Sequence, residues 1–209
     1  MRIGVIGAGR IGANAARLWR NAGHEVVLSF SRDPAALEER AAAIGARAGT
    51  PAEAAAFGEV VMLSVPWRLI DTVLADVGSL DGKIVVDTTN QFGPGGLEDL
   101  PEGRTAAQLN AARMPGARYT KAFNTLTSGF QAEAAGRTGA DRVAMFLAGD
   151  DGEAKKVVAG LIDDAGFTAV DVGGTADAAI MEAPRREGAV YGEEFNEADG
   201  RAFVAGAGA

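Results

Sequence analysis

The sequence predicts an α/β fold in which a doubly wound, mostly parallel sheet is followed by a small C-terminal extension. Two observations support this fold class. Short apolar runs alternate with amphipathic helical segments over residues 1–183, as in successive βαβ units. The first run, Arg2–Ile6, leads directly into Gly7-Ala8-Gly9-Arg10-Ile11-Gly12, which has the spacing of a Rossmann dinucleotide-binding turn.

The glycine turn has the context that this motif requires. A helical pattern through Trp19 follows it, and a second strand is expected over residues 24–28. Gly7 permits the tight turn, Gly9 lets a pyrophosphate approach the backbone, and Gly12 lets the helix pack closely on the strand. The pattern therefore predicts that the cofactor contacts Gly7, Ala8, Gly9, Arg10, Ile11 and Gly12. The alternative is a glycine turn that binds no ligand.

The exit of the second strand indicates which dinucleotide binds. NAD-binding versions place a carboxylate here to bind the ribose 2′-hydroxyl, and that carboxylate would repel a 2′-phosphate. In this chain the strand leads into Ser31 and Arg32, which can donate hydrogen bonds to a phosphate. We therefore expect NADP, although Arg32 as a solvated loop residue is the alternative.

Further elements follow in order along the chain. Periodicity and capping residues predict helices over 33–44, from Thr50, over 68–77, over 105–112 and from the Gly149-Asp150-Asp151 cap to about Ala165. Apolar runs predict strands over 46–48, 60–64, 83–87, 118–123, 142–148 and 168–172. The expected dinucleotide-binding domain is thus 1–183. Residues 184–209 are charged and contain glycine, so we expect an arm or a loop that covers the site.

Three strand exits should meet at the glycine loop. In a doubly wound sheet they line the crevice where a nicotinamide lies. The expected nicotinamide contacts are Val65, Pro66, Trp67 and Ala122. The expected substrate-positioning residues are Asn90, Asn124, Thr125 and Leu126, with no certain catalytic residue among them. The alternatives are helix-start packing for Trp67 and turn or capping roles for the two asparagines.

Composition excludes several classes of function. A net charge of −8 without a basic cluster argues against nucleic-acid and anionic-membrane partners. The chain has no cysteine, and its one histidine, His24, falls at the end of the sheet away from the glycine loop, so no metal site is expected. A strand that begins at residue 2 and the lack of a long apolar run predict a cytoplasmic protein. We also expect a homodimer.

These motifs together resemble a known family over residues 1–183. Besides the glycine turn and Ser31-Arg32, the resemblance rests on Val65-Pro66-Trp67, on the run from Ala148-Gly149-Asp150-Asp151 to Val158, and on residues 166–173. The family is the NADP oxidoreductases that depend on the deazaflavin coenzyme F-420, to which the cytoplasmic domain of membrane ferric reductases is related. The chain departs from it at Asn124, where a histidine is expected, and from Pro184 onward.

The resemblance implies hydride transfer between C4 of the nicotinamide and C5 of the deazaflavin. Such a reaction needs little from side chains beyond orientation and exclusion of water. The implied cofactor is NADP and the implied co-substrate is coenzyme F-420. Two alternatives stay open: an NADPH-dependent reductase of another flavin or a small electrophile, and a non-catalytic NADP-binding redox sensor.

Overall fold

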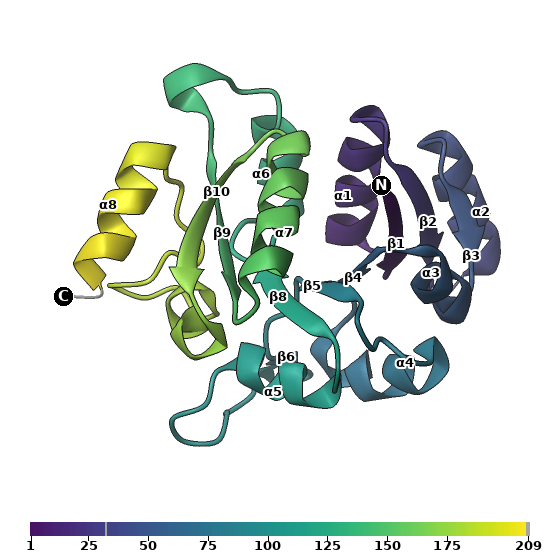
Figure 1. Ribbon diagram of the computed structural model, residues 1–209, viewed down its shortest axis with the longest axis horizontal. Coiled ribbons are helices and arrows are strands. Elements are labelled where there is room, and N and C mark those ends of the chain that lie inside the picture. The colour runs from purple at the N-terminus through teal and green to yellow at the C-terminus, as the bar shows by residue number, and fades with distance from the viewer. Residues whose placement is uncertain (32, 208–209) are drawn as a thin grey trace.

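The computed structural model describes residues 1–31 and 33–207, and its centre is one eight-stranded sheet (Figure 1). The strand order is β10-β9-β8-β5-β4-β1-β2-β3. The strands are β1 (Arg2–Ile6), β2 (Glu25–Ser29), β3 (Arg47–Gly49), β4 (Val60–Leu63), β5 (Ile84–Asp87), β8 (Arg118–Ala122), β9 (Ala144–Gly149) and β10 (Thr168–Gly173). All neighbours pair in parallel except β8 and β9. The predicted doubly wound, mostly parallel fold is confirmed.

Helices cover both faces of the sheet. One face carries α1 (Arg10–Asn21), α2 (Pro34–Ala43), α6 (Ser128–Ala134) and α7 (Gly152–Asp164). The other carries α3 (Pro51–Phe57), α4 (Ile70–Val77), α5 (Ala106–Arg113), α8 (Glu197–Ala207) and the 3₁₀ helix η3 (Thr175–Met181). Among the described residues, no helix is long and apolar enough to cross a membrane.

Successive side chains along a strand point to opposite faces of the sheet, and each face is covered by helices, so both faces are apolar. Val60 and Met62 of β4 belong to the core on the α1 side, whereas Val61 and Leu63 belong to the core on the α3 side. In β1 this alternation includes Gly4, and a Cβ there would stand 2.0 Å from the carbonyl oxygen of Ala54. The missing side chain therefore lets α3 pack directly on the central strand.

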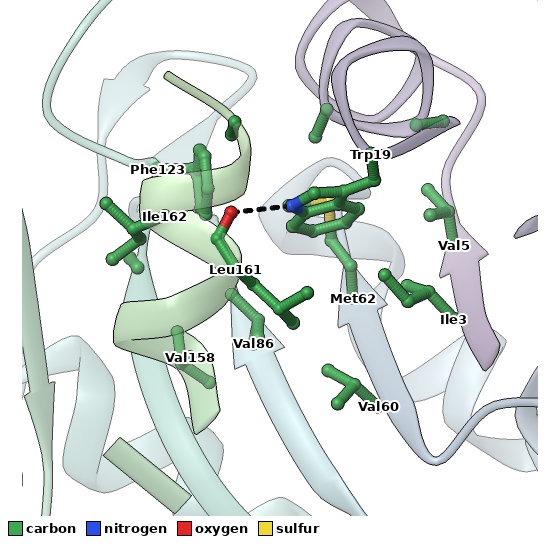
Figure 2. Packing of buried hydrophobic residues seen from close by; sticks show 14 of the residues in the cluster. Ile3, Val5, Trp19, Val60, Met62, Val86, Phe123, Val158, Leu161 and Ile162 are labelled. Atoms are coloured by element: carbon green, nitrogen blue, oxygen red, sulfur yellow. Dashed lines mark hydrogen bonds between the residues drawn. The ribbon is translucent and has the colours of Figure 1, made fainter. Parts of the chain in front are cut away.

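Trp19 joins the two halves of the α1 face (Figure 2). Its indole is completely buried, and Nε1 donates to the carbonyl oxygen of Leu161 in α7 at 2.8 Å. The ring also meets Phe123 edge-on, with 5.6 Å between the ring centroids. Because Phe123 directly follows β8, this packing links α1 and α7 to a strand end that borders the site.

Several elements differ from the sequence-based expectation. The predicted loop over 88–96 contains a hairpin, β6 (Phe92–Gly93) and β7 (Gly96–Leu97), and the helix expected over 68–77 opens as the 3₁₀ helix η1 (Trp67–Leu69). Helix α6 and η3 were not expected, and α8 occupies much of the predicted C-terminal arm. Short helices such as α6, with seven residues, give too few turns for periodicity to show.

The predicted cap of α7 is confirmed at Asp151, whose carboxylate accepts hydrogen bonds from the backbone N–H groups of Glu153 and Ala154 at 3.0 Å. Arg118 adds a bidentate contact at 2.6 and 3.0 Å. The Arg118 hydrogen bond, followed by those from the helix N-terminus, holds the pKa of Asp151 well below its ordinary value of 3.8.

A folded-state pKa below the unfolded value means that this stabilisation is present above the unfolded value and is lost as the pH falls through the folded one. Asp151→Asn should therefore be less stable than wild type at neutral pH, and the difference should shrink from about pH 4 downward. Urea unfolding across this range measures it. A difference that stays constant with pH would contradict the assignment.

Candidate functional site

The glycine loop has the geometry of a phosphate cradle. Gly7 has a φ of +123°, and a Cβ on it would lie 2.1 Å from the carbonyl oxygen of Ser64. A Cβ on Gly12 would lie 2.0 Å from the carbonyl oxygen of Gly7, so α1 packs directly on the turn. By contrast, Gly9 faces open space, with no atom within 4 Å of a built Cβ. The three glycines thus have three different environments, each matching its expected role.

The N-terminus of α1 leaves N–H groups available for an anion. Gly9 is the N-cap and provides no side-chain hydrogen bond, and the first turn carries no acidic residue. Unpaired N–H groups and the positive end of the helix dipole favour a phosphate at this position. The residues present therefore fit a dinucleotide pyrophosphate.

A cavity of about 470 Å³ extends from this loop past the end of β2. Ser31 lines it together with Arg40 of α2 and Arg68 of η1. Asp33 also lines it, but its carboxylate caps α2 by accepting from the N–H groups of Ala35 and Ala36. The carboxylate nearest the expected 2′-phosphate is thus engaged elsewhere. Arg32, predicted to bind this phosphate, lies outside the described residues.

A second cavity, of about 690 Å³, lies at the carboxyl ends of β1, β4, β5 and β8. It brings together most of the residues predicted for the nicotinamide and its partner. Those present are Gly9, Arg10, Ile11, Val65, Pro66, Trp67, Asn90, Asn124, Thr125 and Leu126. Ala122 is not among the lining residues, and its side chain is completely buried in the core on the α1 face. The next residue, Phe123, lines the cavity instead.

Two strand exits at the crevice adopt a backbone conformation that is unusual for bulky side chains. Phe30 and Phe123 have φ values of +58° and +60°. A non-glycine residue in this region costs about 1–3 kcal/mol and persists where its surroundings require it. Both residues line a cavity, so the strain coincides with the proposed binding crevice.

Asn90 and Asn124 follow the carboxyl ends of β5 and β8, where they line the larger cavity and hydrogen-bond to each other. Asn90 Nδ2 donates to the carbonyl oxygen of Asn124 at 3.0 Å, and Asn124 Nδ2 donates to Asn90 Oδ1 at 3.2 Å. Asn124 Nδ2 also donates to the carbonyl oxygen of Met181 at 2.6 Å. Both asparagines therefore have a structural role in addition to their place at the cavity. Asn124 Oδ1 and Thr125 Oγ1 are buried without a partner among the described residues.

The indole of Trp67 is fixed by its neighbours. Nε1 donates to the Glu98 carboxylate at 3.0 Å, and the guanidinium of Arg113 lies 4.8 Å from the ring centroid. Glu98 follows the hairpin β6–β7, so this bond ties the hairpin to the cavity wall. Trp67 thus packs at the start of η1 and also lines the cavity, where a contact with the nicotinamide stays a prediction.

Sequence reasoning missed several residues at the two cavities. Phe92, Arg185, Tyr191 and Gly192 line the larger one, and Arg40 and Arg68 line the smaller. Arg185, Tyr191 and Gly192 come from residues 184–196, where the backbone N–H of Gly192 donates to the carbonyl oxygen of Thr125 at 2.9 Å. The sequence predicted an arm or a loop that covers the site over 184–209, but no local pattern identifies which of its residues line the cavity, because the tertiary path of the segment determines this.

Comparison with known proteins supports this interpretation. Residues 2–91 match the family described as NADP oxidoreductase, coenzyme F-420-dependent. The family resemblance predicted from the sequence is confirmed. A solved structure of a candidate F-420-dependent NADP reductase from Arthrobacter sp. is 26% identical, with a TM-score of 0.70, and the match covers 85% of this chain and 87% of that one.

Two other relatives are similar in sequence, and the first of them is a solved structure that also agrees in fold. A hypothetical protein from Sinorhizobium meliloti is 29% identical, with a TM-score of 0.82, and the match covers 94% of this chain and 95% of that one. Metalloreductase STEAP3 from Rattus norvegicus is 30% identical over 185 residues, which is 87% of this chain. The chain spans 36% of the length of that curated relative. Together with the family match, these comparisons support an NADP-dependent oxidoreductase.

Proposed function

We propose that this protein transfers a hydride between NADP(H) and the deazaflavin coenzyme F-420. The family match supports both partners by name, and the Arthrobacter relative carries the same description. The observation that carries the proposal is the chemistry of the larger cavity: no aspartate, glutamate, histidine or lysine is among the described residues that line it.

This lining suits a reaction in which side chains orient rather than exchange protons. When bound, the nicotinamide supplies or accepts the hydride at C4. Val65 and Pro66 provide apolar walls, while Arg10 stands at the N-terminus of α1 beside the expected pyrophosphate. Reduction of the deazaflavin also takes up one proton, which solvent can deliver to its ring. Reduction of a carbonyl or imine instead favours a positioned acid at the reacting atom.

The direct test mixes the protein with NADPH and oxidised F-420 and follows loss of deazaflavin absorbance. We expect turnover that depends on both compounds and is slower with NADH. Turnover with flavin mononucleotide or a small electrophile, but none with F-420, would replace this proposal with a different reductase. Tight NADPH binding without turnover of any acceptor would favour a redox sensor.

One observation favours the second enzyme candidate, an NADPH-dependent reductase of a small electrophile. Tyr191 is the one weak acid among the described lining residues of the larger cavity. Burial raises the pKa of its phenol above the ordinary value of 10.0, so the hydroxyl stays protonated and can donate a proton or a hydrogen bond. Tyr191→Phe separates the candidates, since it should abolish reduction of an electrophile and spare hydride transfer to F-420.

Cofactor choice gives a further prediction. Arg32→Ala should weaken NADPH binding by ~1.5–3 kcal/mol, about 10- to 150-fold in Kd, because the 2′-phosphate loses a charged partner. NADH binding should barely change. Fluorescence titration with both cofactors measures this, and Arg47→Ala is the matched control because its guanidinium stacks on Phe57, 5.2 Å from the ring centroid. Equal losses for NADPH and NADH would defeat the assignment.

A further inference from the structure

A buried ionic network lies next to the loop that follows β5 and lines the larger cavity. The side chains of Lys121 and Asp87 are both fully buried, with 3.5 Å between Nζ and Oδ2. Lys121 Nζ also lies 3.8 Å from Oε1 of Glu182, which is 4% exposed. Charged side chains are rarely buried to this degree unless they are paired and hydrogen-bonded. Neither the sequence motifs nor the proposed hydride transfer accounts for these three groups.

Each carboxylate in the network has further partners. Asp87 accepts from the Thr89 backbone N–H at 2.8 Å and from Asn110 Nδ2 at 2.7 Å. The hydroxyl of Tyr119 also donates to it, and burial together with the Asp87 charge raises the pKa of this phenol, which keeps the donor protonated. Glu182 accepts from the first two N–H groups of α5, at 2.8 Å each. The charges are thus held in fixed positions.

The lysine connects two segments that border the cavity. Its Nζ donates to the carbonyl oxygen of Thr89 at 2.6 Å, and Thr89 lines the cavity. On its other side is Glu182, the residue from which the chain leaves η3 toward the cavity. Neighbouring backbone groups repeat this connection: the N–H of Ala183 donates to Asn90 Oδ1 at 3.2 Å, and its carbonyl oxygen accepts from Gln91 Nε2 at 3.0 Å.

The segment that begins at this anchor forms one wall of the cavity. Residues 184–196, the wall segment, contribute Arg185, Tyr191 and Gly192 to the lining. The wall segment is thus attached at Glu182–Ala183 and again where Gly192 bonds to Thr125.

We propose that Lys121 and Glu182 are positioning residues for the acceptor: their buried ion pair holds the wall segment against residues 88–91, the loop that follows β5, and so sets the width of the acceptor side of the cavity. This inference rests on the proposed function for the identity of the acceptor. A buried ion pair is often no more stabilising than apolar residues of the same volume, so its value here lies in a defined geometry.

The test is Glu182→Gln, which keeps the volume of the side chain, removes its charge and leaves one acceptor oxygen for the two N–H groups of α5. We expect the KM for oxidised F-420 to rise at least tenfold, with kcat within threefold and the Kd for NADPH within twofold. Trypsin cleavage after Arg185 and Arg186, which are both exposed, should accelerate at least tenfold in the folded variant. The matched control is Arg118→Gln on β8, the strand that also carries Lys121. It breaks the ion pair with Asp151, the N-cap of α7, and should leave KM and cleavage unchanged.

A purely structural role predicts lower thermal stability with wild-type KM and wild-type cleavage in the folded protein, and that result would overturn the inference. If Glu182→Gln does not fold, Lys121→Met combined with Glu182→Met removes both charges and gives the same readouts. Absence of F-420 turnover in the wild type would refute the proposed acceptor. Trypsin cleavage would still decide the role of the ion pair, with unchanged cleavage in a folded variant overturning it.

Discussion

Gly7→Ala is expected to destabilise the protein by about 3–5 kcal/mol and to abolish NADPH binding. Two costs combine at this position. The φ of +123° is strained for any residue with a side chain, and the new Cβ would lie 2.1 Å from the Ser64 carbonyl oxygen. Because the backbone of Gly7 fixes the position of a Cβ and the Ser64 oxygen is itself backbone, relief requires the ends of β1 and β4 to separate at the crevice. Urea unfolding and NADPH titration measure the two losses.

Gly9→Ala provides the matched comparison on the same loop. Its φ of −72° suits alanine, and a Cβ there meets no atom within 4 Å. Stability should therefore stay within about 1 kcal/mol of wild type, while NADPH affinity falls at least tenfold because the methyl group occupies the path of the pyrophosphate. A stable Gly9→Ala protein with wild-type affinity would place the pyrophosphate elsewhere.

Trp19→Ala is expected to cost about 3–5 kcal/mol, the range for truncating a large buried aromatic side chain. The indole is completely buried between α1 and α7, and it is the edge-on partner of Phe123 (Figure 2). Trp19→Phe should cost clearly less, because an aromatic ring still fills most of the space and the losses are the hydrogen bond to Leu161 and a smaller buried volume. Chemical unfolding of both variants measures the difference.

Trp19→Ala should also alter the shape of the larger cavity. Phe123 keeps a φ of +60° beside the site, and Trp19 is among the groups that hold it there. In the folded fraction of Trp19→Ala we expect weaker NADPH binding, with Phe57→Ala as a control from the edge of the other face. Unchanged NADPH affinity would show that Phe123 keeps its conformation without the indole.

The fold and the phosphate-binding end of the site were predictable because their signals are local. Gly7, Gly9 and Gly12 have environments that match the three expected roles, and the caps at Thr50 and Asp151 are observed. In each case the residue acts on its own turn or on the adjacent strand. Local spacing is then enough to identify the element and its role.

The acceptor side could not be predicted in the same way. Tyr191 and Arg185 reach the cavity through contacts between segments about 60–100 residues apart, such as that of Gln91 with Ala183. Lys121 gave no signal, because a lysine in a strand ordinarily faces solvent. The direction of β9 was also hidden, since an apolar run has the same periodicity in a parallel and an antiparallel pair.

The reversed direction of β9 has a practical consequence for protein engineering. Because β8 and β9 run antiparallel, the carboxyl end of β9 lies at the opposite edge of the sheet from the cofactor crevice. The Gly149-Asp150-Asp151 turn there already has its carboxylates occupied, Asp151 by Arg118 and Asp150 by the N–H and hydroxyl of Thr175, at 2.8 and 2.7 Å. Thermostability can therefore be optimised at this edge, and cofactor preference at the other, as two independent design problems.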